Sequence, residues 1–216
     1  MKISHTLFII VLMIILFAPF TGCDKSKEIT KSPFPPIVLE NPLQEYAFAN
    51  NFLKNNFVLR TKQPDLSTEI GMQFSASKAG ILWAIGFKMP EKGKYFISLW
   101  EVASKQLILT DSVSYTDTSK FIYKALLSLN KAVTIDKNKD YMAGVFLAKR
   151  PPESPLPYYI LSNPGVQLFA FTQGHITCKA TPVLKTTAPV YPAINSLDNG
   201  FIYFGLVDIG YYATEF

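Results

Sequence analysis

Between residues 69 and 147 the sequence is a series of short apolar segments, each separated from the next by a turn. The segments are rich in β-branched and aromatic residues, and Gly, Pro, Asp, Asn or Lys residues bound them, as is typical of strands. No helical periodicity of comparable length occurs in the sequence. We interpret six segments as consecutive antiparallel strands: Glu69–Phe74, Gly80–Phe87, Tyr95–Trp100, Leu107–Tyr115, Phe121–Leu129 and Tyr141–Leu147.

Large and small side chains alternate within these segments, as on a strand with one buried face. Ile81, Trp83, Ile85 and Phe87 share one parity of their segment. Several segments also carry an apolar residue on the other parity, such as Phe96. Two stacked sheets with partly covered outer faces explain this better than one exposed sheet. The pattern therefore predicts an all-β fold, an antiparallel β-sandwich.

Several motifs in this region resemble the domain of unknown function DUF4082. They are E-I-G-x-x-F at Glu69–Phe74, G-x-x-x-x-I-x-F at Gly80–Phe87, and a turn at Gly93 followed by S-L-W at Ser98–Trp100. Later residues that fit are Val133, Ile135, Tyr141, Ala143, Asn199, Gly200, Tyr211 and Tyr212. The resemblance implies a jelly-roll-like sandwich in a secreted bacterial protein, often beside carbohydrate-active modules. It brings no enzymatic residues.

Residues 1–22 are interpreted as a lipoprotein signal peptide. Lys2 supplies the positive charge, residues 7–17 are an uninterrupted apolar run, and Thr21-Gly22-Cys23 resembles the lipobox, whose cysteine becomes the lipidated N-terminus. The alternatives are an ordinary signal peptide or an uncleaved anchor, although the run is short for a membrane span. We expect lipid on Cys23 to hold the protein on a membrane of the bacterial cell envelope, the outer membrane in a Gram-negative cell.

Residues 23–45 are predicted to be a tether, and residues 46–216 the folded domain. Charged residues and prolines without apolar periodicity fill most of the tether. Asn41-Pro42-Leu43-Gln44 offers an N-cap followed by proline at the first helical position, which predicts a short helix through Ala49.

Composition narrows the functional classes. The chain carries 21 basic and 16 acidic residues, a net charge of +5, without an arginine-rich run. We therefore expect no nucleic-acid partner. Hydrophobic residues make up 49% of the chain and aromatic residues 14%, which is ample for a packed core and too apolar for disorder.

Motifs for catalysis or a cofactor are not found, and we predict neither. His175 is the one histidine beyond the signal peptide, and Gln173–His175 is typical of a surface turn. Cys178 is the one thiol besides Cys23, so we expect no internal disulfide and a buried apolar role. Asp136–Asp140 imitates the start of a calcium loop but lacks its glycine and terminal glutamate, and indicates a turn. A metal held between distant loops stays open, and paired carboxylates for hydrolysis cannot be located from sequence.

Ligand binding is the remaining class, and aromatic side chains are its candidates. Trp83 stands where the family pattern favours a smaller residue, and its parity points inward unless a bulge reverses it. Residues 149–164 contain five prolines and are predicted to form a loop across one end of the sandwich. At most one of the adjacent Tyr158 and Tyr159 can easily be core. We predict that Trp83, Arg150, Tyr158 and Tyr159 bind the ligand.

The sequence thus predicts a lipid-anchored envelope protein that acts as a non-catalytic binding module for a glycan or protein ligand. The alternatives are a structural subunit of an envelope complex and a hydrolase of unrecognised type.

Overall fold

The computed structural model describes residues 37–51, 57–62, 68–126, 132–148, 156–161, 168–186, 188–192, 202–203 and 205–215. Cys23 and Arg150 lie outside these ranges. The chain separates into two units, Met1–Pro35 and Pro36–Phe216, and all described residues belong to the second. The domain boundary expected at residue 46 stays a prediction.

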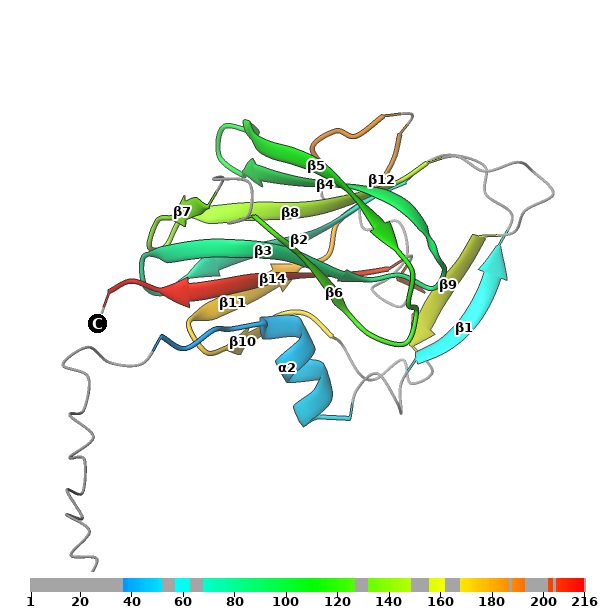
Figure 1. Ribbon diagram of the computed structural model, residues 1–216, viewed down its shortest axis with the longest axis horizontal. Helices are drawn as coiled ribbons and strands as arrows, with labels where there is room; N and C mark the ends of the chain where they lie inside the picture. Colours follow the sequence, from blue (N-terminus) through cyan, green and yellow to red (C-terminus); the bar gives the residue numbers. More distant parts are fainter. Residues whose placement is uncertain are drawn as a thin grey trace, which may run out of the picture. The chain divides into compact units, whose positions relative to one another are not determined.

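One helix and fourteen strands make up the described part of the chain (Figure 1). In chain order they are α2 (Pro42–Ala49), β1 (Phe57–Lys62), β2 (Thr68–Ala76), β3 (Gly80–Lys88), β4 (Gly93–Glu101), β5 (Leu107–Tyr115), β6 (Ile122–Ala125), β7 (Val133–Ile135), β8 (Asp140–Leu147), β9 (Leu156–Leu161), β10 (Phe171–Gln173), β11 (Ile176–Ala180), β12 (Val183–Lys185), β13 (Ile202–Tyr203) and β14 (Leu206–Ala213). Strands β2, β3, β4, β5 and β8 coincide closely with predicted segments.

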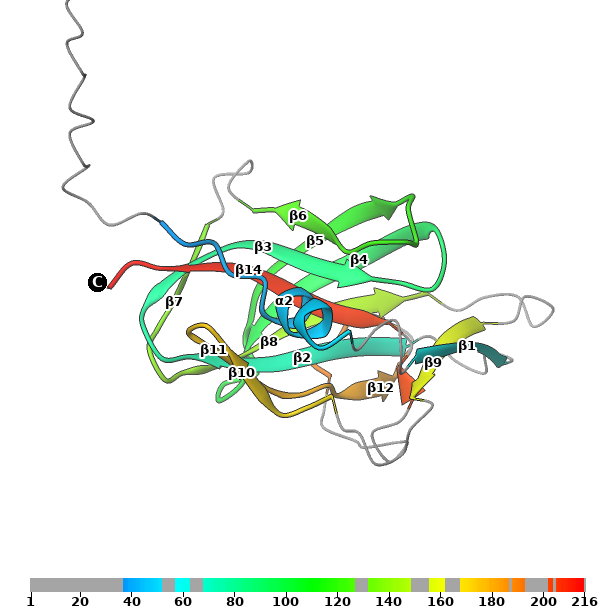
Figure 2. The same ribbon diagram turned by 90° about the horizontal axis from the view of Figure 1, so that it is seen from below.

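The described strands form three antiparallel sheets. The seven-stranded sheet has the order β10-β11-β2-β8-β4-β5, with β12 also pairing with β2. The four-stranded sheet has the order β14-β3-β6, with β7 also pairing with β3, and the three-stranded sheet has the order β1-β9-β13. The sheets pack against each other, as Figures 1 and 2 show, so the predicted all-β antiparallel sandwich is confirmed.

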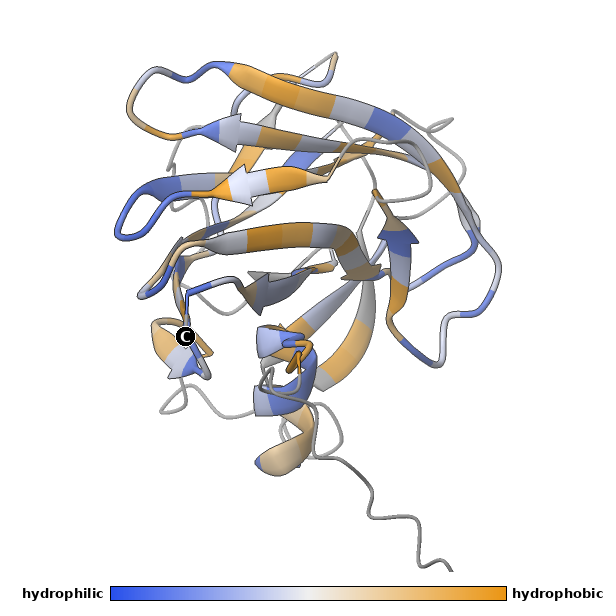
Figure 3. Ribbon diagram, turned by 60° about the vertical axis from the view of Figure 1, so that its left-hand side comes forward, coloured by the Kyte–Doolittle hydropathy of each residue, from blue (hydrophilic) through white to orange (hydrophobic). Residues whose placement is uncertain are grey.

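The core lies where the seven-stranded and four-stranded sheets face each other. On β4, Ile97 and Leu99 are completely buried, and β3 and β14 contribute Ile85 and Ile209. Ser98 lies between two core residues of β4 but is not part of the core cluster, because neighbouring side chains of a strand point to opposite faces. Hydrophobic and hydrophilic residues accordingly alternate along several strands (Figure 3).

One segment folds differently from the prediction. The expected loop over residues 149–164 contains strand β9, Leu156–Leu161, which lies between β1 and β13. Proline fits there because Pro157 pairs with Thr61 of β1, whereas β13 pairs only with two later residues of β9. The sheet therefore has a local edge at Pro157, where a missing N–H is tolerated.

The first described segment is part of the sandwich. Helix α2 starts at Pro42, as predicted, but Asn41 makes no side-chain cap. Asp208 of β14 replaces that cap, because its carboxylate accepts hydrogen bonds from the backbone N–H groups of Leu43 (3.0 Å) and Gln44 (2.9 Å). Leu43 is completely buried in the core. The helix is therefore docked by both a polar and an apolar contact.

Candidate functional site

The outer face of the seven-stranded sheet carries the side chains that alternate with the core. On β2, β8 and β4 these residues lie outside the core cluster: Glu69, Gly71, Gln73, Met142, Gly144, Phe146, Phe96, Ser98 and Trp100. Strand register sets their neighbours, because Ser98 of β4 pairs with Gly144 of β8, and Gly144 pairs with Gly71 of β2. The central position of this face thus holds two glycines with longer side chains around them.

Three outer-face residues form a chain of hydrogen bonds, which we call the polar chain. The indole Nε1–H of Trp100 donates to Oγ of Ser98 at 2.9 Å, and the Ser98 hydroxyl donates to Oε1 of Glu69 at 3.0 Å. The missing side chain of Gly144 provides the space, since a Cβ atom there would lie 2.5 Å from both Glu69 Oε1 and Ser98 Oγ. All three members come from the E-I-G and S-L-W motifs of the sequence.

Glu69 is the ionisable group of the polar chain, and burial shifts its pKa. Its side chain is 0% exposed, and its Oε2 atom has no hydrogen-bond partner among the described residues. Burial raises the pKa of Glu69 to about 8, while the Ser98 hydrogen bond lowers it by less. The carboxyl group is therefore largely protonated at neutral pH.

Pro182, Tyr191 and Pro192 cover part of the β2 side of this face. The backbone N–H of Gly71 donates to the Pro182 carbonyl at 2.8 Å, and a Cβ atom on Gly71 would lie 3.0 Å from Pro192. Tyr191 meets the Trp100 ring edge to face, with centroids 6.0 Å apart. Glu69 is therefore beneath the covered part of the face, and Trp100 marks its border.

The β4–β5 side of the same face is open. Phe96 is 39% exposed, Leu107 is 43% exposed and lies opposite Trp100, and Trp100 is half-buried. The Nζ atom of Lys94 lies 5.9 Å from the centre of the Phe96 ring. We call Phe96, Trp100 and Leu107 the apolar platform. Such a surface can hold the apolar face of a sugar ring or an apolar side chain of a protein.

Trp83 occupies a β-bulge of β3. Gly210 and Tyr211 are consecutive on β14, but they pair with Ala84 and Leu82, so Trp83 is the extra residue. A bulge of this kind reverses the parity of the strand. The parity of Trp83 in the sequence points inward unless a bulge reverses it. The structure contains this bulge, and Trp83 is half-buried rather than completely buried.

The contacts of Trp83 are those of a packed side chain. Its ring lies 6.1 Å from that of Tyr123, nearly parallel, and a Cβ atom on Gly210 would collide with it. Its Nε1 atom is buried without a hydrogen-bond partner among the described residues. Tyr123 in turn donates its hydroxyl to Asp208 at 2.6 Å. Trp83 thus packs beside the group that caps helix α2.

Tyr158 and Tyr159, which were also predicted to bind ligand, lie on a different sheet from Trp83. Tyr158 and Tyr159 lie on β9 of the three-stranded sheet, whereas Trp83 lies on the four-stranded sheet. Both tyrosines are half-buried and pack against the core, so the expected division into one buried and one exposed tyrosine is not found. Burial and the nearby Tyr115 raise the pKa of Tyr159 above its usual range. The binding role of these residues stays a prediction, as does that of Arg150.

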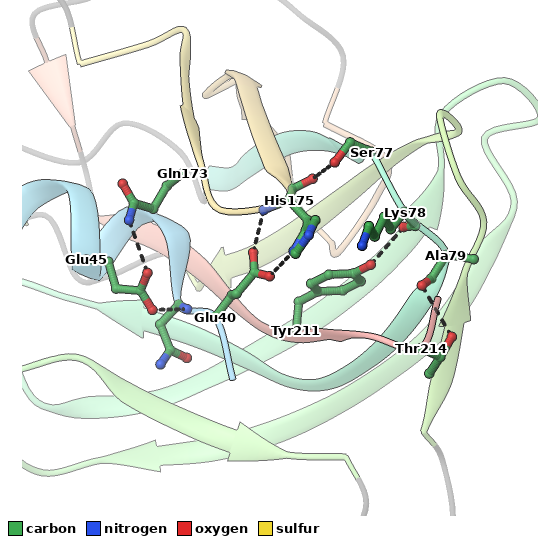
Figure 4. Close-up of polar contacts among 10 residues, drawn as sticks. Glu40, Glu45, Ser77, Lys78, Ala79, Gln173, His175, Tyr211 and Thr214 are labelled. Atoms are coloured by element: carbon green, nitrogen blue, oxygen red, sulfur yellow. Dashed lines mark hydrogen bonds and ion pairs between the residues drawn. The ribbon is translucent and has the colours of Figure 1, made fainter. Parts of the chain in front are cut away.

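A second polar cluster ties the first described segment to the sandwich (Figure 4). Glu40 is 4% exposed and exchanges two backbone hydrogen bonds with Tyr211, of 2.7 and 2.9 Å. Its carboxylate accepts the backbone N–H of His175 at 2.7 Å and contacts the Nδ1 atom at 2.5 Å. Gly174 has φ of +56°, and a Cβ atom there would collide with Glu40. His175 lies in the predicted surface turn, but no local pattern in the sequence indicates Glu40 as its partner.

The predictions for Cys178 and for the turn at Asp136–Asp140 agree with the structure. Cys178 is completely buried, and burial raises the pKa of its thiol. Asp136–Asp140 contains a turn, with Asn138 at φ of +59°. Within the described residues, His, Cys, Asp and Glu side chains form no group of three or more that could hold a metal ion. No helix in that part of the chain is long and apolar enough to cross a membrane.

Comparison with known proteins does not assign a family. No protein-family model matches the sequence, and no match is found among curated proteins. The resemblance to DUF4082 therefore stays a prediction. What the fold and the outer face define is an all-β sandwich whose outer sheet face carries an open apolar platform and a buried carboxyl group of raised pKa.

Proposed function

We propose that the protein is a lipid-anchored component of the bacterial cell envelope that binds a glycan or protein ligand without catalysis. The apolar run and Thr21-Gly22-Cys23 support the anchor. The observation that carries the binding role is the exposure of Phe96, 39%, on the sheet face that also holds the half-buried Trp100. An aromatic ring left in water is costly for folding alone, and it is the side chain that stacks on sugars and anchors interfaces.

A hydrolase is the alternative that Glu69 raises, because glycosidases need an acid with a raised pKa. Such an enzyme also needs a second carboxyl group about 5–10 Å from the first, and an open path to substrate. Glu69 is 0% exposed, and its described hydrogen bond is to Ser98. These features favour a binding role for the open platform over a catalytic role for the covered acid.

A glycan array on the purified protein, followed by affinity measurements on variants, tests the binding role. Phe96→Ala removes the most exposed ring of the platform and should weaken binding about three- to tenfold without lowering the melting temperature. Leu59→Ala is the matched control, because Leu59 is 55% exposed but lies on β1 of another sheet. Equal affinities for Phe96→Ala and the unmodified protein would exclude the platform.

The same series tests the residues predicted from sequence. Tyr158→Ala and Tyr159→Ala are compared separately with Trp83→Ala, and each affinity is read beside the melting temperature. A loss of affinity at constant stability for one of the tyrosines, with none for Phe96→Ala, would transfer the site to β9. An array without any bound glycan, together with stable co-purification of another envelope protein, would favour the structural-subunit alternative.

The anchor is tested by Cys23→Ser, which should release the protein from membranes or leave an unprocessed precursor. The intact mass of membrane-extracted protein should show acyl chains on a mature chain that starts at Cys23. An unmodified mature N-terminus would refute the anchor while leaving the binding role intact.

A further inference from the structure

The first described segment contains both strongly exposed and buried residues. Ile37, Val38, Leu39 and Phe48 are 64%, 63%, 54% and 63% exposed, and they are among the most exposed large apolar residues of the described chain. Residues between them are buried, namely Glu40, Leu43 and Ala47. Figures 1 and 2 show this segment and helix α2 along the outside of the molecule, beside β14, β10 and β11. We call the four exposed residues the N-terminal strip.

The strip is held in place rather than loosely attached. Glu40 follows Leu39 directly and is fixed by its backbone pair with Tyr211 and by its carboxylate contacts with His175. The N-terminus of α2 is fixed by Asp208. The exposure of the strip is therefore a property of the docked segment. Four large apolar side chains in water within twelve residues, counted from 37 to 48, call for a covering surface.

The chain before the strip indicates which surface covers it. Residues 24–36, thirteen residues, separate Cys23 from Ile37. Fully extended, this length reaches about 45 Å, and as a flexible coil it spans about 20 Å on average. A lipid on Cys23 would thus keep the strip within a few nanometres of a bilayer. At the millimolar effective concentration of such a tether, even a weak apolar contact is largely occupied.

Charge also favours a lipid surface. The connecting residues include Lys25, Lys27 and Lys31 against Asp24 and Glu28, a net charge of +1. Basic residues next to a membrane are attracted to anionic headgroups, and apolar side chains enter the boundary between headgroups and acyl chains. A second copy of the chain would have to match the strip with a surface of its own, whereas the bilayer needs no specific shape.

We propose that Ile37, Val38, Leu39 and Phe48 are a membrane-contact site that rests on the bilayer holding Cys23. This inference rests on the proposed lipid anchor. The contact gives the tethered domain one orientation instead of free rotation. In Figure 1, β4 and β5 lie at the edge away from α2, so the contact turns the apolar platform away from the membrane.

The test uses the lipidated full-length product in vesicles of phosphatidylethanolamine and phosphatidylglycerol. Single cysteines at Val38 and Phe48 carry an environment-sensitive fluorophore, and nitroxide-labelled lipids act as the quencher. Ser104→Cys, in an exposed turn, and Leu59→Cys, an exposed apolar residue on β1, are the matched controls. Cys178 is buried, and the chain without an added cysteine reports any background label. We expect quenching at residues 38 and 48 to be at least threefold stronger than at residues 59 and 104.

Each result decides the proposal. Protein that carries acyl chains and stays with the vesicles, but shows equal quenching at all four positions, overturns the membrane contact and leaves the anchor standing. Energy transfer between copies at residue 38 without lipid quenching assigns the strip to a second copy and also overturns it. Protein without acyl chains that leaves the vesicles refutes the anchor, and the membrane contact with it.

Discussion

Glu69→Gln is the substitution that most directly tests the reading of the outer face. Glutamine keeps the size of the side chain and an oxygen that accepts from Ser98, but it removes the titrating proton. In the unmodified protein the pKa of Glu69 is about 8, against 4.5 for an ordinary glutamate. The variant should therefore be more stable than the unmodified protein at neutral and alkaline pH.

The magnitude follows from proton linkage. Below the ordinary pKa the carboxyl group is protonated in both states and its contribution to stability is fully present. As the pH rises from 4.5 toward 8, the unfolded chain loses this proton while the folded chain keeps it, so stability falls by about 1.4 kcal/mol per pH unit. From about pH 5 to about pH 7.5 the unmodified protein should lose about 3 kcal/mol relative to Glu69→Gln.

Urea unfolding at a series of pH values measures this difference, and subtraction of the two curves cancels the titrations that both proteins share. Glu101→Gln is the matched control, because hydrogen bonds from Lys139 and Ser104 lower the pKa of Glu101. Its carboxyl group is ionised in both states in this range, so its difference curve should be nearly flat. A flat curve for Glu69→Gln as well would mean that Glu69 is ionised in the folded protein, and would refute the protonated buried acid.

Three further substitutions test the packing. Leu99→Ala should cost about 2–5 kcal/mol in urea unfolding, because Leu99 is completely buried on β4, and a loss well under 1 kcal/mol would be inconsistent with that burial. Gly174→Ala should cost more than about 1 kcal/mol, because it strains a positive φ and meets Glu40, and unchanged stability would contradict the close contact. Asp208→Asn places an amide donor against backbone N–H donors and should lower the free energy of unfolding by about 1–3 kcal/mol. Relative to the unmodified protein, hydrogen exchange should become faster in α2 by a larger factor than in β4.

Strand positions could be predicted from sequence because a buried face leaves a period of two in the residues. This is why β3, β4 and β8 lie where the alternation placed them. The pattern does not record insertions in the pairing, however. The bulge at Trp83 depends on how β3 pairs with β14, more than 120 residues later in the chain. Strand β9 was missed for a similar reason, since its partners on both sides decide whether a proline is tolerated.

The candidate site was less predictable than the fold. Glu69, Ser98 and Trp100 were recognised as motif residues but not as a site. The sequence signal that could have indicated a site is Glu69 itself, a glutamate inside an otherwise apolar strand. Their meeting depends on the register across β8, where Gly144 leaves space for them. Glu40 and His175 are 135 residues apart, and no local pattern connects them. Such contacts are set by topology rather than by spacing along the chain.

The capping of helix α2 by Asp208 also sets an order of assembly. A helix of eight residues is too short to persist in water by itself, and the acceptor for its first N–H groups is 165 residues away on β14. Helix α2 can therefore be completed only after β14 has joined β3. During synthesis of the chain, this N-terminal helix stays open to proteases until nearly the whole domain has followed. A chain cut before Leu206 would lose its N-terminal helix together with its last strand.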